Sequence, residues 1–173
     1  MRKSFAKVLL NAGKGRDPRR GKLRESAGEG KRQGSGDGAS ASEAVGAFVQ
    51  SYGSKHLDAS ALLLPLVGFL PAHDERVRST VEAIERHLVH DGLVHRYDSE
   101  AGVDGLPPGE GAFLACSFWL AQNLVLLDRR REALTLFGRL LSLRNDVGLL
   151  SEQYDPKTLR LLGNFPQALS HMR

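Results

Sequence analysis

The apolar positions of this chain fall into five segments, which we interpret as helices of two alternating kinds. Three segments are apolar on almost every face, as helices that are buried on all sides are. The other two repeat apolar residues every three or four positions, as helices with one solvent-facing side do. The first kind covers residues 56–70, 111–127 and a segment that begins near 165; the second covers 74–89 and 129–144.

Several residues mark the expected ends and bends of these helices. Asp58 is placed to cap the first helix and Asn164 to cap the last, while Gly92 is placed to end the second. Pro65 should kink the first helix, because proline lacks the backbone N–H that a helix interior needs. Between the helices we expect a short extended stretch over residues 93–97 and loops over residues 98–109 and 145–163.

The spacing of the buried helices predicts an array of helical hairpins. These helices begin near Leu57, Ala112 and Phe165, which are 55 and 53 residues apart, and an amphipathic helix lies between each pair. Such a period is typical of stacked α-hairpins with an inner and an outer layer. An α/α toroid and a solenoid both fit this pattern. We therefore expect an all-α fold of roughly two and a half helical hairpins.

Charge divides the chain into two parts. Residues 1–40 hold 11 basic and 4 acidic side chains, a net charge of +7, whereas residues 41–173 hold 13 basic and 16 acidic, a net of −3. The first part is rich in glycine and serine and poor in large apolar residues, so it cannot bury enough surface to order itself. We expect a disordered basic leader over residues 1–45 and a folded domain over residues 46–173.

The same composition excludes several kinds of partner and site. The leader has no aromatic residue from position 10 to 47, so bases have no stacking platform and we expect no specific nucleic-acid partner. No apolar run reaches the roughly 18 residues of a membrane span, and Lys7 interrupts the short apolar start. We therefore expect a cytoplasmic protein without a membrane segment. The lone Cys116 and the scattered histidines predict neither a disulfide, a metal site nor a cofactor.

Each buried helix is preceded by a polar loop that contains aromatic residues, and hairpin stacking brings the three loops to one end of the array. Carboxylates supply acid and base groups, and aromatic rings stack on sugar faces, so this combination suits a carbohydrate site. Any solvent-exposed loop can contain the same residue types. The candidates are His56, Asp58, Arg96, Asp98, Glu110, Glu152 and Asp155, with Tyr52, Tyr97 and Tyr154.

The chain also contains three long motifs: QSYGSKHLDASALLLPLVGFLP, DGLPPGEGAFLACSFWLAQNL and RNDVGLLSEQYDPKTLRLLGNFPQALSH. They resemble the C-terminal half of the catalytic domain of glycoside hydrolase family 15, which includes glucoamylases, glucodextranases and bacterial trehalases. The likeness runs from about Gly46 to His171. It implies a partial (α/α)6 toroid and inverting hydrolysis of α-glucosidic bonds, with an α-glucan or an α-glucoside oligosaccharide as substrate.

The resemblance implies that Glu152, in LLSEQYDP, is the general base. Such a base activates water while a carboxylic acid about 6.5–9.5 Å away protonates the leaving oxygen. The resemblance also implies that Arg96 and Glu110 bind substrate, and Tyr52 and Tyr154 are candidates from their place in the loops. Without the resemblance, residue chemistry is also consistent with other roles: Glu152 as an exposed loop acid, Arg96 as a surface charge and Glu110 as a helix cap.

The family's general acid lies in the earlier half of the barrel, for which we find no matching segment. A closed barrel of this family has twelve helices, and the sequence predicts about five. We therefore expect a fragment that carries the general-base half of the site and has no activity alone. The alternative is a non-catalytic helical-hairpin module that binds a partner protein or associates with itself through exposed helix flanks. The sequence does not choose among starch-type, dextran-type and trehalose substrates.

Overall fold

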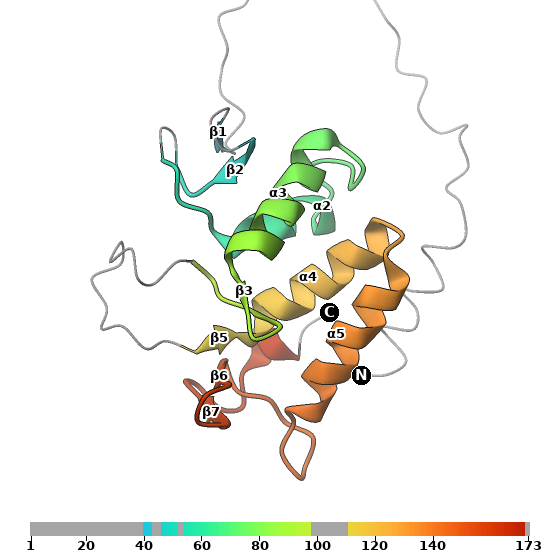
Figure 1. Ribbon diagram of the computed structural model, residues 1–173. Coiled ribbons are helices and arrows are strands. Elements are labelled where there is room, and N and C mark those ends of the chain that lie inside the picture. Colours follow the sequence, from blue (N-terminus) through green and yellow to red (C-terminus); the bar gives the residue numbers. More distant parts are fainter. Residues whose placement is uncertain (1–39, 43–45, 52–53, 98–110, 172–173) are drawn as a thin grey trace, which may run out of the picture.

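The computed structural model describes residues 40–42, 46–51, 54–97 and 111–171, and Figure 1 shows the arrangement of its elements. Its N-terminal part contains β1 (Ser40–Ser42), β2 (Ala47–Val49), the 3-10 helix η1 (Ala59–Leu62) and α2 (Leu63–Leu66). The middle contains α3 (Glu75–His87), β3 (Val89–His90), β4 (Leu93–Val94), β5 (Ala112–Phe113), α4 (Leu114–Leu126) and α5 (Arg130–Ser142). The C-terminal part contains β6 (Gln153–Asp155), β7 (Arg160–Leu162) and the 3-10 helix η3 (Ala168–Ser170).

Three of the predicted helices form close to their expected positions. Helix α3 begins after Asp74, whose side chain accepts the N–H of Arg76 as an N-cap. Helix α4 is buried along almost its whole length, as its apolar composition predicts. It packs antiparallel beside α5 on one flank, while η1 and α2 contact its other flank (Figure 1). The alternation of buried and half-buried helices is therefore present.

The expectation of an all-α fold is not confirmed, because the described residues also form three small antiparallel sheets. Strands β1 and β2 pair, β3 and β4 form a hairpin, and β5, β6 and β7 form a three-stranded sheet. Of the leader that we expected to be disordered, only residues 40–42 are described, and they form β1. The segment expected to be a loop over 145–163 contains the β6–β7 hairpin, whose turn is stabilised by the Asp155 side chain.

The first and last helices that we expected to be buried are shorter than the sequence predicts, and α2 contains no buried residue. Asp58 caps η1 by accepting the N–H of Ser60, as expected, but helical structure ends at Leu66 rather than Leu70. Pro65 falls in the first turn of α2, where a missing N–H costs no helical hydrogen bond. At the other end of the chain, Asn164 does not cap a helix. The cap of η3 is Gln167, and the side chain of Asn164 bonds elsewhere.

Gly92 does not end α3 either. The C-cap of that helix is Leu88, and Gly92 lies in the tight turn between β3 and β4. The hairpin places the N–H of Val94 against α4, where it donates to the Ser117 hydroxyl at 2.8 Å. The segment that follows β4 is thereby held beside the first turns of α4.

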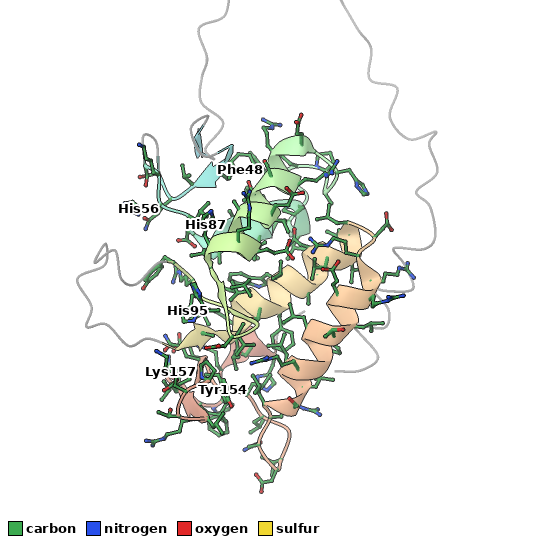
Figure 2. The ribbon with its side chains drawn as sticks, viewed as in Figure 1. Phe48, His56, His87, His95, Tyr154 and Lys157 are labelled. Carbon is green, nitrogen blue, oxygen red and sulfur yellow. The ribbon has the colours of Figure 1, made fainter. Side chains whose placement is uncertain are left out.

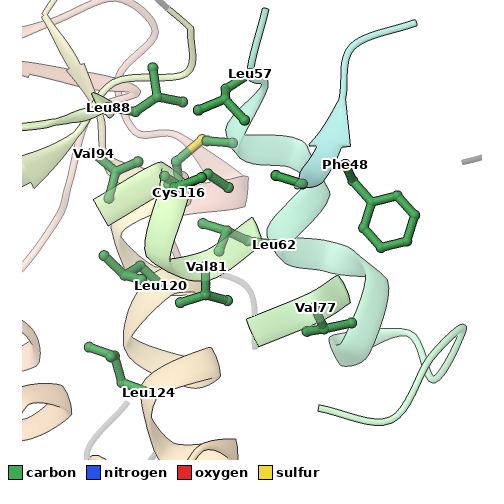
Figure 3. Close-up of a cluster of buried hydrophobic side chains, with 14 of the residues drawn as sticks. Phe48, Leu57, Leu62, Val77, Val81, Leu88, Val94, Cys116, Leu120 and Leu124 are labelled. Carbon is green, nitrogen blue, oxygen red and sulfur yellow. The ribbon is translucent and has the colours of Figure 1, made fainter. Parts of the chain in front are cut away.

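Two clusters of buried apolar side chains lie on either side of α4. The larger joins β2, η1, α3 and α4, and Figure 3 shows Phe48, Leu62 and Val81 among its members. The smaller joins Leu93 and Leu150 with residues of β5, α4 and α5. A buried polar contact adds to the first cluster, because the Asn123 amide donates to the carbonyl oxygen of Leu62 at 2.8 Å. Helix α4 is therefore the central element of the fold.

Candidate functional site

Strands β4, β5 and β6 lie near the N-terminal end of α4 (Figure 1), and backbone hydrogen bonds attach two candidate residues to the starts of α4 and η1. The N–H of Leu114, the first residue of α4, donates to the carbonyl oxygen of Glu152 at 3.0 Å. The N–H of Ala59, the first residue of η1, donates to the carbonyl oxygen of Arg96 at 2.8 Å. The starts of α4 and η1 thus hold the segments that carry Glu152 and Arg96, respectively.

Glu152 precedes β6 and is half-buried. Its Oε2 accepts a hydrogen bond from the Asn164 side-chain amide at 3.0 Å and another from the Asn164 backbone N–H at 3.2 Å. In return, the N–H of Glu152 donates to the carbonyl oxygen of Asn164 at 2.9 Å. The carboxylate is therefore oriented through one oxygen rather than extended freely into solvent.

Arg96 follows β4, and half of its side chain is exposed. Its Nε lies 4.0 Å from Oδ1 of Asp58, and its guanidinium lies 5.9 Å from the centroid of the Tyr97 ring. Asp58 is much less exposed than Arg96, and the same carboxylate caps η1. A half-exposed guanidinium with one nearby carboxylate keeps donors available for the hydroxyl groups of a ligand.

Tyr154 lies in the middle of β6, opposite Ala112 of β5 and Leu161 of β7. Its side chain packs against the smaller apolar cluster, so part of its role is structural (Figure 2). The backbone of Tyr154 also approaches Gly111 closely. A Cβ at Gly111 would lie 2.7 Å from the Tyr154 carbonyl oxygen, which is nearer than packed atoms come.

Two of the predicted substrate-binding residues, Glu110 and Tyr52, lie outside the described residues, as does Asp98. His56 is exposed on the segment before η1 (Figure 2). Asp155 lies at the β6–β7 turn, where bonds from the Thr158 hydroxyl and the Lys157 N–H hold the pKa of its carboxyl below the usual range. We therefore assign Asp155 to the turn.

Two groups near the candidate residues have a pKa that is shifted from its ordinary value. Burial raises the pKa of the Cys116 thiol to about 12, and the nearby Asp58 carboxylate adds to this effect. Cys116 is therefore a core residue, as its place in a buried helix predicts. Burial also lowers the pKa of His95, which packs edge-on against the His90 ring, and the charge of His90 lowers it further.

Asn164, which bonds to the Glu152 carboxylate, was expected from the sequence to cap the last helix. A signal was present in the stretch YDPKTLRLLGN, where Asp-Pro followed by Thr is typical of a turn between two strands. A hairpin there brings the residues after β7 back to the start of β6.

No group of three or more metal-ligating side chains occurs among the described residues. No helix in the same part of the chain is long and apolar enough to cross a membrane.

Comparisons with known proteins identify relatives of this chain. The trehalase of Thermoplasma acidophilum is 48% identical over 126 residues, which cover 72% of this chain and 21% of that protein. The trehalase of Mycobacterium tuberculosis is 48% identical over 127 residues, which cover 73% of this chain and 19% of that protein. The chain therefore spans about a fifth of the length of these relatives.

Solved structures give the same answer for the fold. A wild-type glycosidase matches with a TM-score of 0.58 and 25% identity over 76% of this chain and 33% of its own. A glycosidase variant in complex with glucose matches with a TM-score of 0.57 and 25% identity, over 66% of this chain and 29% of its own. The family model described as glycosyl hydrolases family 15 matches residues 32–173. The chain thus belongs to glycoside hydrolase family 15.

Proposed function

We propose that this chain carries the general-base half of the active site of an inverting α-glucoside hydrolase, with Glu152 as the base. The observation that carries the proposal is the half-buried Glu152 carboxylate, held through Oε2 at the N-terminal end of α4 within the family match. An inverting hydrolase needs such a carboxylate to take a proton from the attacking water.

Trehalose is the substrate that we propose, because several relatives that match over about 126 residues are trehalases. In this proposal Arg96 donates to substrate hydroxyl groups, and Glu110, Tyr52 and Tyr154 complete the binding surface. The half-exposed guanidinium of Arg96 supports its part, while the packing of Tyr154 against the smaller apolar cluster leaves only part of its side chain for a ligand.

The proposed architecture is an arc of an (α/α)6 toroid over residues 46–173, behind a basic leader over residues 1–45. Helix α4 together with η1 and α2 belongs to its inner layer, and α3 and α5 belong to its outer layer. The contacts of α4 with η1 on one side and α5 on the other support this assignment. In this family the general acid comes from an earlier part of the barrel, so we propose that the chain alone has no turnover.

A chimaera tests the role of Glu152. The 126-residue segment of the Thermoplasma acidophilum trehalase that matches this chain is replaced by the corresponding residues of this chain. We expect the chimaera to release glucose from trehalose, and Glu152→Gln to lower kcat by about 10² or more, the scale of a lost general base. Glu82→Gln is the matched control, since Glu82 is exposed on α3. An active chimaera whose kcat survives Glu152→Gln would contradict the proposal.

The unmodified chain tests the expected inactivity. Purified chain is incubated with trehalose, maltose or dextrin, and released glucose is measured. We expect none. Glucose release that Glu152→Gln abolishes would show that the chain contains its own acid.

A second candidate function is a non-catalytic module that associates with itself through the flanks of its helices. Large apolar side chains are exposed beside α2 and on α5, where Val67 is 73% and Leu134 is 53% exposed. Scattered exposed apolar residues are common on monomers, so this candidate ranks second.

A further inference from the structure

The hydrogen bonds of Glu152 are unequal between its two carboxylate oxygens. Both bonds from Asn164 go to Oε2, one from the side-chain amide at 3.0 Å and one from the backbone N–H at 3.2 Å. Within the described part of the chain, Oε1 accepts no hydrogen bond. A carboxylate that is held in this way has one oxygen engaged and one oxygen available.

The residue before Asn164 makes room for this arrangement. Gly163 has a φ of +70°, a backbone conformation that side chains other than glycine rarely adopt. A Cβ at this position would lie 2.9 Å from Oε2 of Glu152 and 3.0 Å from its Cβ. Gly163 therefore allows the chain to turn against the Glu152 side chain and to direct the Asn164 amide at Oε2.

The backbone on both sides makes this pairing rigid. Glu152 donates its N–H to the carbonyl oxygen of Asn164 at 2.9 Å and accepts the N–H of Leu114 on its own carbonyl oxygen at 3.0 Å. The first bond joins Glu152 to the end of the β6–β7 hairpin, and the second joins it to α4. Hydrogen bonds from N–H groups to an ionised carboxylate are stronger than neutral ones, so the side-chain contact adds to an already ordered frame.

We propose that Asn164 is the positioning residue of the general base: it holds Oε2 of Glu152 so that Oε1 faces the attacking water. This inference rests on the proposed role of Glu152. A general base must hold its acceptor oxygen within hydrogen-bond reach of the proton that it removes. A carboxylate whose side chain rotates freely meets that condition for only part of the time. Asn164 removes this freedom through its bonds to Oε2.

The test measures the side-chain rotamer of Glu152 by NMR in the complete, isotopically labelled chain. Three-bond couplings to the Glu152 Cγ and Cδ atoms report whether its torsion angles occupy one staggered state or an average. We expect a single dominant rotamer in the unmodified chain. In Asn164→Ala we expect the couplings to move towards rotamer averages. The side-chain amide resonances of Asn164 should also shift in Glu152→Gln.

The controls separate positioning from a general loss of structure. Asn145→Ala removes another loop amide whose Oδ1 accepts the Leu149 N–H, and it should leave the Glu152 couplings unchanged. Asn164→Asp keeps the shape of the side chain but loses the side-chain donor, while the backbone N–H remains, and it should loosen Glu152 as Asn164→Ala does. If Asn164→Ala does not fold, this variant and the amide resonances in Glu152→Gln still decide the question.

Two results would overturn the inference: averaged Glu152 couplings in the unmodified chain, or unchanged couplings in a folded Asn164→Ala variant. Neither measurement depends on turnover. Failure of the general-base proposal would instead appear in the chimaera, as trehalose hydrolysis that survives Glu152→Gln. The two proposals can therefore fail separately.

Discussion

At the scale of single residues, the Cys116 thiol provides a pH-dependent probe of the buried core. It lies on α4 within the larger apolar cluster (Figure 3), and the Asp58 carboxylate that caps η1 acts on it electrostatically. Burial and that negative charge both disfavour the thiolate, so the pKa of Cys116 is raised from 9.0 to about 12. The unfolded chain consequently loses the proton first as the pH rises.

We predict that Cys116 lowers the free energy of unfolding between pH 9 and 12 and has no such effect at neutral pH. At pH 10.5 the loss should be on the order of 2 kcal/mol, at about 1.4 kcal/mol for each unit between the unfolded pKa and the pH. Denaturant unfolding at pH 7 and pH 10.5 measures it. Between pH 7 and pH 10.5 the free energy of unfolding of the Cys116→Ala variant should fall by about 2 kcal/mol less than that of the unmodified chain. Equal losses in both proteins would show that the thiol ionises readily in the folded state.

The roles of individual site residues were only partly predictable from sequence. The N-cap role of Asp58 follows from its chemistry and its place before an apolar run, and the structure confirms it. The attachment of Asn164 to Glu152 depends on a hairpin that brings together residues twelve positions apart. A cap at the start of a helix is a local contact, whereas the Asn164 bond is a tertiary one. Side-chain chemistry alone therefore favoured the wrong role for Asn164.

At the scale of secondary-structure elements, the sheet β5–β6 depends on a close backbone contact at Gly111. A Cβ there would lie 2.7 Å from the carbonyl oxygen of Tyr154, and a strand backbone cannot move aside as a flexible side chain does. Gly138, in the middle of α5, has no atom within 4 Å of the Cβ it lacks. The same substitution should thus have opposite effects at the two positions.

We predict that Gly111→Ala lowers the free energy of unfolding by about 1–3 kcal/mol, the usual range for overpacking. Gly138→Ala should raise it by about 0.5–1 kcal/mol, because alanine favours a helix over glycine. Chemical denaturation of both variants measures the two changes. A neutral Gly111→Ala would mean that β5 can withdraw from β6 without loss.

The elements themselves were predicted best where periodicity extends over several turns. Helices α3, α4 and α5 each have three or more turns of consistent pattern, and their ends agree within a few residues. The segment 56–70 was interpreted as one helix, because its apolar composition cannot distinguish a buried helix from other buried backbone. Strands β6 and β7 have three residues each, too few for an alternating pattern to stand out. Their pairing with β5 is a tertiary contact that no local pattern reports.

At the scale of the whole molecule, the second candidate function makes a prediction of its own, which is self-association through the apolar side chains exposed on the helix flanks. We expect sedimentation velocity to show a concentration-dependent shift from monomer to larger species. Leu134→Ser on α5 should weaken it, since that side chain is 53% exposed. Leu159→Ser is the matched control, because Leu159 is exposed in the β6–β7 turn and not on a helix. A single monomeric species at all concentrations would contradict the prediction and the second candidate function.

The attachment of Glu152 and Arg96 through their backbone atoms has a practical consequence. Both residues are held by bonds from helix N-termini to their own carbonyl oxygens, which every amino acid possesses. Replacing Glu152 by its amide should consequently leave the main-chain framework in place. On the proposed role of Glu152, such a substitution would turn the chimaeric enzyme into a sugar receptor that retains its ligand uncleaved, suitable for capturing the bound disaccharide in a crystal.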